Sequence, residues 1–113
     1  MNRARVSCLL FFAIVGIADI SNAVDLDDFK AATFVDSSGF QMPYRLFVPP
    51  DYDSNSSYPI VLFLHGAAGC GTDNEKHLSN ANQHGSMVWA MPENQAKSPA
   101  FVVAPQAPVG KLA

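Results

Sequence analysis

A loop of small residues that follows a short apolar run is the part of this sequence best suited to chemistry. The run spans residues 60–64, and the loop then reads His65-Gly66-Ala67-Ala68-Gly69-Cys70-Gly71. In open α/β sheets, ligands bind beyond the carboxyl ends of the strands. Small side chains let backbone N–H groups approach a ligand closely, and an oxyanion is stabilised by such fixed donors. The pattern therefore predicts an oxyanion-binding loop.

The other reactive side chains form no catalytic or metal-binding set. His65 suits a hydrogen-bonded structural role better than that of a base, because the loop needs donors and not a proton shuttle. Ser86 has no base or sharp turn beside it, so we do not expect it to be a nucleophile. His77 and His84 lie seven residues apart, whereas helical zinc motifs pair histidines at a spacing of four. We expect no metal, and we expect Cys70 to be a small buried residue or to pair elsewhere.

Two short strands are predicted ahead of the loop. Residues 31–35 and 42–48 are rich in strand-forming residues, and the turn Asp36-Ser37-Ser38-Gly39 lies between them. Pro49 and Pro50 end the second strand, because proline cannot donate to a ladder. The pair is expected to form an antiparallel hairpin.

Two apolar runs then predict a parallel pair of strands. Residues 60–64 and 101–105 are apolar throughout, as in strands covered on both faces by helices. The segment between them is long enough for a crossover helix. Thr72 and Glu75 fit a capping box, which predicts a helix from about Thr72 to Gln83 that stops at Gly85, and Trp89 is expected to pack in the core. The fold class is therefore α/β.

The first 23 residues are expected to be a cleaved secretory signal. Arg3 and Arg5 supply a positive start, residues 6–18 are mostly apolar, and Ser21-Asn22-Ala23 offers small residues for cleavage. The apolar run is too short for a membrane span. We therefore expect a secreted protein, extracellular or periplasmic, with no membrane contact after cleavage and with one domain over residues 24–113.

Composition excludes some partners. The formal charge is −3, and no basic run exists beyond the leader. Nucleic acid and anionic membrane surfaces are therefore not expected as partners.

The order of these segments resembles the α/β-hydrolase fold, and within it a group of secreted esterases and predicted peptidases that is similar to polyhydroxybutyrate depolymerases and dienelactone hydrolases. The resemblance covers nearly all of the chain after the leader, and it is carried by residues 44–49, 58–66, 71–74, 92–95 and 101–106. Such proteins often place an acid–base pair where this chain has Gly69-Cys70.

The resemblance implies a site and a reaction. Gly66 and Ala67 would shape the oxyanion hole with the Ala67 N–H as donor, and His65 would orient the loop. The substrate would be a small or polymeric carboxylic ester, and no cofactor would be needed. The family's Gly-x-Ser-x-Gly nucleophile motif is absent from these 113 residues, and the acid and base normally follow it. The chain is therefore expected to be an N-terminal, truncated part of the domain and inactive alone.

Two alternatives remain beside the esterase. One is a fragment of a prolyl-oligopeptidase-like peptidase, which uses the same scaffold. The other is a non-catalytic truncated remnant that keeps the loop but has no nucleophile to serve.

Overall fold

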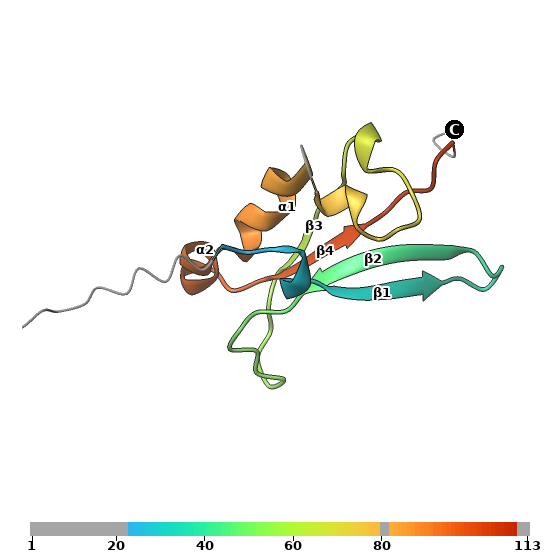
Figure 1. Ribbon diagram of the computed structural model, residues 1–113. Coiled ribbons are helices and arrows are strands. Elements are labelled where there is room, and N and C mark those ends of the chain that lie inside the picture. Colours follow the sequence, from blue (N-terminus) through green and yellow to red (C-terminus); the bar gives the residue numbers. More distant parts are fainter. Residues whose placement is uncertain (1–22, 80–81, 111–113) are drawn as a thin grey trace, which may run out of the picture.

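The part of the protein that the structure describes is a four-stranded mixed sheet with short helices over one face (Figure 1). The computed structural model describes residues 23–79 and 82–110, so the leader lies outside the described residues except for Ala23. The sheet order is β1-β2-β4-β3. The strands are β1 (Lys30–Val35), β2 (Gln41–Phe47), β3 (Ile60–Leu62) and β4 (Phe101–Pro105), the helices are α1 (Gln83–Ala90) and α2 (Pro92–Lys97), and the 3-10 turns are η1 (Leu26–Asp28), η2 (Ala67–Gly69) and η3 (Lys76–Leu78).

The predicted hairpin is confirmed. β1 and β2 pair antiparallel from Lys30 opposite Leu46 to Val35 opposite Gln41. The turn between them is fixed by Asp36, whose carboxylate accepts from the backbone N–H of Ser38 at 2.8 Å and of Phe40 at 3.0 Å. This hairpin forms one end of the sheet and leads the chain toward β3.

The parallel pair is confirmed as well, but its burial differs from the prediction. β3 and β4 pair in parallel, with Val61 beside Val102. Val102 is fully buried, whereas Ile60, Leu62 and Leu64 are 67%, 60% and 70% exposed. The described helices cover only one face of the sheet, so the apolar run is not buried on both sides.

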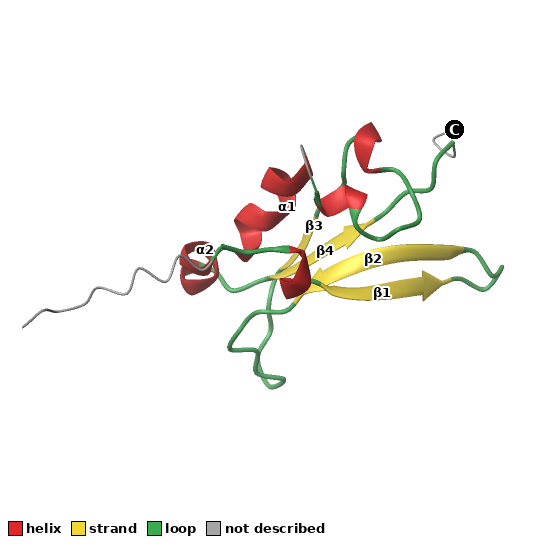
Figure 2. Cartoon of the chain, viewed as in Figure 1, coloured by secondary structure: helices red, strands yellow, loops and turns green. Residues whose placement is uncertain are grey.

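The predicted helix from Thr72 to Gln83 is wrong. Within residues 72–79 the chain makes only the single turn η3, and the helix α1 begins later, at Gln83 (Figure 2). Asn74 has φ 56°, in the left-handed region that no right-handed helix contains. The N-cap of this turn is Glu75 and not Thr72, and the first amides are bound by Asp73, whose carboxylate accepts from the N–H of Glu75 and Lys76 at 3.0 and 3.1 Å.

Gly85 lies inside α1 and does not end it. A Cβ at this position would overlap the ring of Phe63, so glycine allows the helix to lie close to Phe63, the residue after β3. The need for close packing therefore outweighs the poor helix propensity of glycine.

We expect Gly85→Ala to destabilise the fold by about 1–2 kcal/mol, because overpacking outweighs a propensity gain of roughly 1 kcal/mol. Chemical unfolding followed by circular dichroism measures this change. Adding Phe63→Leu should recover most of the loss, since it removes the ring that the new methyl group meets. Equal stability of Gly85→Ala and the wild type would show that the contact is not tight.

The core lies between the sheet and α1. Its buried members are Phe29, Phe47, Leu78, Met87, Ala90, Val102 and Ala104. The prediction that Trp89 packs in this core is wrong, because Trp89 is 50% exposed. Helix α1 buries Ser86, Met87 and Ala90, and Trp89 falls outside that narrow face. No helix within residues 23–79 and 82–110 is long and apolar enough to span a membrane.

Candidate active site

The predicted loop lies where the two parallel strands end. Residues 65–71 follow β3, and Gln106 and Ala107 follow the neighbouring strand β4. Gly66 precedes the single turn η2 (Ala67–Gly69), in which the N–H of Gly69 donates to Gly66 O at 2.9 Å and that of Cys70 to Ala67 O at 3.2 Å. The turn fixes the direction of the amides in the loop.

His65 is bonded through both ring nitrogens to the backbone. The N–H of Ala107 donates to Nε2 at 2.9 Å, so Nε2 accepts. In the neutral ring the proton is therefore on Nδ1, which donates to the Gly66 carbonyl at 2.7 Å. A Cβ at Gly69 would lie 2.6 Å from Nδ1, so the ring is also packed tightly against the loop. His65 holds the loop in place through both of its ring nitrogens.

The two residues expected to shape the oxyanion hole differ in the surroundings of their amides. The Gly66 N–H donates to Asn82 Oδ1 at 2.9 Å. The Ala67 N–H has no acceptor among the described residues. A cavity of about 240 Å³ adjoins the loop, and its lining is mostly apolar: Met42, Leu64, His65, Gly66, Ala67, Cys70, Pro105 and Ala107. Ala67, whose N–H has no partner among the described residues, thus lines a small cavity.

The side chains that hold this loop by hydrogen bonds were not predicted from the sequence. Gln106 is fully buried. Its Nε2 donates to Gly69 O at 3.0 Å and to Asp73 Oδ1 at 2.8 Å, and its Oε1 accepts from the N–H of Asn74 at 2.6 Å. A polar residue directly after an apolar strand was the only signal for this role. The neutral side chain of Gln106 thus binds the end of the loop to the Asp73-Asn74 turn.

Asn74 joins the same network to the hairpin. Its Nδ2 donates to Tyr44 O at 3.0 Å, and its carbonyl accepts from Arg45 Nε at 2.8 Å. The hydrogen bond from Gln106, followed by those from the N–H of Lys76 and Glu75, holds the pKa of the Asp73 carboxyl well below its usual range. Asp73 is therefore an acceptor throughout the neutral range.

The remaining candidates lie apart from the loop or are buried. Ser86 is fully buried and donates to Gln83 O within α1. His84 is exposed on α1. No group of metal-ligating side chains exists in the part of the chain that the structure describes. Cys70, a free thiol there, is half-buried and not fully buried as one alternative expected.

His77 is buried beneath the loop, with its ring centroid 6.0 Å from that of His65. Its Nε2 donates to Ala104 O at 2.9 Å, and its Nδ1 has no partner within the described chain. Burial lowers the pKa of His77, although the Ala104 carbonyl acts in the opposite direction. The folded protein therefore keeps this ring neutral.

This burial predicts a pH dependence of stability. Below the ordinary histidine pKa of about 6.5, the unfolded chain binds a proton that folded His77 does not, so the free energy of unfolding falls as the pH drops. Asp73 acts only at more acidic pH, because a lowered carboxyl pKa gives stability that is lost below about pH 4. Urea midpoints at pH 5.5 and 7.5 measure the effect. We expect His77→Gln to weaken it and His84→Gln to leave it unchanged; an unaltered pH difference in His77→Gln would contradict the assignment.

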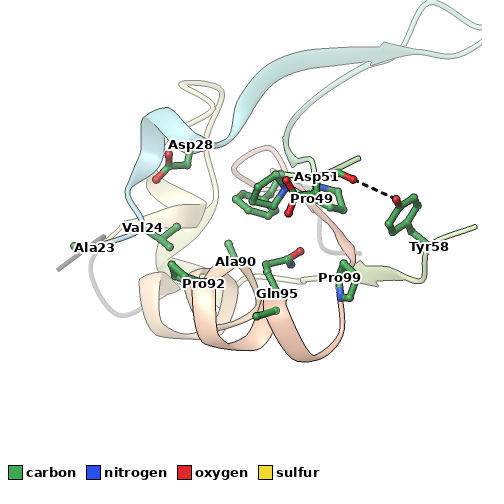
Figure 3. Close-up of a pocket in the computed structure, with 13 residues that line it drawn as sticks. Ala23, Val24, Asp28, Pro49, Asp51, Tyr58, Ala90, Pro92, Gln95 and Pro99 are labelled. Atoms are coloured by element: carbon green, nitrogen blue, oxygen red, sulfur yellow. Dashed lines mark hydrogen bonds between the residues drawn. The ribbon is translucent and has the colours of Figure 1, made fainter. Parts of the chain in front are cut away.

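A larger cavity, of about 660 Å³, lies at the other end of the sheet (Figure 3). Phe47, Pro49, Tyr58 and Pro99, near the amino ends of β3 and β4, contribute to its wall. It contains none of the residues predicted for the site. The loop predicted from the sequence therefore lines the smaller cavity and not the larger one.

The chain is similar to known hydrolases in sequence and in structure. No protein-family model matches the chain. A crystal structure of a thermostable esterase is 51% identical, with a TM-score of 0.67, over 73% of this chain and 22% of its own. Two probable dipeptidyl-aminopeptidases B, from Arthroderma benhamiae and Trichophyton verrucosum, are 33% identical over 64 residues, which is 57% of this chain and 7% of theirs. The chain thus spans about a fifth of the solved esterase and a small part of the curated relatives.

The predicted fold class and family resemblance are confirmed. The antiparallel hairpin, the parallel strands and the crossover helices form the N-terminal part of an α/β-hydrolase fold, as in the esterase.

Proposed function

We propose, from the premise that this chain is the N-terminal part of an α/β-hydrolase fold, that it contributes the oxyanion-hole loop of a secreted serine hydrolase acting on carboxylic esters. One observation carries the proposal. The Gly66 N–H is bound to Asn82, whereas the Ala67 N–H has no acceptor among the described residues, and Ala67 lines a cavity. A donor that is fixed and unsatisfied is what a developing oxyanion requires.

The reaction would follow the serine-hydrolase scheme. A serine attacks the ester carbonyl, and the carbonyl oxygen becomes an oxyanion held by the Ala67 N–H and by the amide that follows the nucleophile. A histidine and an acid would move the proton, and these groups with the serine would come from outside the 113 residues. The role of His65 is to orient the loop, since its ring nitrogens are bonded to the backbone.

The ester assignment follows the stronger likeness. The solved relative that is 51% identical is named an esterase, whereas the 33% identical relatives are named aminopeptidases. The second likeness favours the peptidase alternative. The loop would serve either reaction, because ester and peptide hydrolysis both pass through a tetrahedral oxyanion. A non-catalytic remnant is the third possibility.

Expression of the complete reading frame that contains these codons separates the three. Hydrolysis of p-nitrophenyl butyrate, with little cleavage of a dipeptidyl p-nitroanilide, is the expected result. Preferential cleavage of the anilide would favour the peptidase. Hydrolysis of neither substrate by a folded product would favour the remnant.

We expect export with cleavage after Ala23, which is exposed. The exported protein would begin at Val24, and N-terminal sequencing of material from outside the cytoplasm measures this. A Leu or Lys residue in place of Ala23 should block processing. Recovery of exported protein that still begins at Met1 would contradict the leader assignment.

A further inference from the structure

Gln106 sits where three parts of the site meet. Its side chain is fully buried at the end of β4. It contacts Gly69 O at the end of η2, the Asp73 carboxylate and the Asn74 N–H, all within 3.0 Å. A Cβ at Gly71 would lie 3.0 Å from Gln106 Nε2, so the chain also passes closely around the amide.

Only a side-chain amide matches these partners. Gly69 O and Asp73 Oδ1 need donors, whereas the Asn74 N–H needs an acceptor. A carboxylate accepts only, and lysine or arginine donates only. Because Asp73 stays ionised, a glutamate at position 106 would also place two negative charges together.

The contacts act on the turn that carries Ala67. Gly69 is the last residue of η2 and Ala67 the first. His65 and Asn82 hold Gly66, just before the turn, through its carbonyl and its N–H. Gln106 holds the opposite end through Gly69 O. With both ends bound, the Ala67 N–H is held in one direction.

We propose that Gln106 is a positioning residue that sets the orientation of the Ala67 amide through Gly69 and the Asp73-Asn74 turn. The functional meaning of this role rests on the proposed oxyanion function. Its own attachment to the sheet is separate, because the Gln106 backbone N–H donates to Pro43 O and does not depend on the side chain.

Gln106→Glu in the full chain tests the role, with Gln95→Glu as a matched control. Gln95 is also a buried glutamine, and its Nε2 donates to the carbonyls of Trp89 and Ala100. Hydrogen exchange followed by mass spectrometry at low micromolar concentration compares peptides that cover residues 66–75 with peptides from β2.

We expect Gln106→Glu to speed exchange in residues 66–75 by about tenfold or more, because unsatisfied buried groups shift local opening by such factors. Exchange in β2 should change less than about twofold. Gln95→Glu should leave residues 66–75 unchanged. The double variant Gln106→Glu/Asp73→Asn should restore much of the protection, since asparagine can donate to the new carboxylate and still cap the turn.

Two results would overturn the proposal. One is unchanged exchange in residues 66–75 of Gln106→Glu. The other is an equal increase of exchange in residues 66–75 and in β2 that the added Asp73→Asn substitution does not reverse. That result would mean that Gln106 stabilises the whole fold and not the loop in particular. Exchange does not depend on hydrolysis, so an inactive complete protein with the expected loop response would contradict the proposed function alone.

Discussion

Ala67→Pro is expected to lower kcat by about 10²–10³ with little change in KM, as the loss of one oxyanion donor does. The substitution removes the N–H and little else. Ala67 is the first residue of η2, where proline is tolerated, and Gly66 before it is extended at φ −76° and ψ 173°. A fall in kcat would therefore come from the loss of the Ala67 N–H donor and not from a change in the fold.

The solved esterase provides a host for this experiment. The part of this chain that matches it, 73% of the 113 residues, can replace the corresponding segment, since the two are 51% identical over that part. Ala67→Ser is the matched control, because it keeps the N–H and should keep activity. If Ala67→Pro hydrolyses p-nitrophenyl butyrate as fast as Ala67→Ser does, the Ala67 N–H is not a donor to the oxyanion.

Phe29→Ala is expected to destabilise the fold by about 3–5 kcal/mol, the usual cost of removing a buried phenylalanine ring. Phe29 is 1% exposed, and its ring lies 5.4 Å from that of Phe47, at the centre of the core. Small domains have total stabilities of only about 5–15 kcal/mol. The substitution should therefore remove much of the stability of the chain.

Urea unfolding at low micromolar concentration, followed by circular dichroism, measures the loss. Phe34→Ala in β1 is the control, because Phe34 is 58% exposed and its removal should cost little. The Arg45 guanidinium should keep its contact in the variant, since it binds the carbonyl of Phe29 and not the ring. A similar stability of the two alanine variants would show that Phe29 is not central to the core.

The strands could be predicted from the sequence because their signals are local. The alternation of residues 42–48, the two prolines that follow and the apolar run 101–105 each act within a few residues. The crossover helix could not be placed. No helix begins at Thr72 because Asn74 is left-handed and its side chain bonds to Tyr44 O in the hairpin, and the position of α1 depends on the contact of Gly85 with Phe63. Both are contacts between distant segments.

The site divides in the same way. The loop of small residues after an apolar strand could be recognised from the sequence. The side chains that bind this loop could not be recognised. Asn82 lies 16 residues from Gly66, whose N–H it binds, and Gln106 lies 37 residues from Gly69, whose carbonyl it binds. Only the parallel pairing of β3 with β4 brings Gln106 beside the loop.

The claim that this chain belongs to a serine hydrolase is tested most directly by sequencing the transcript through and past codon 113. We expect the frame to continue into Gly-x-Ser-x-Gly, followed by an acid and then a histidine. A stop codon directly after Ala113 in the message would leave an oxyanion loop with no nucleophile, and it would contradict the catalytic claim.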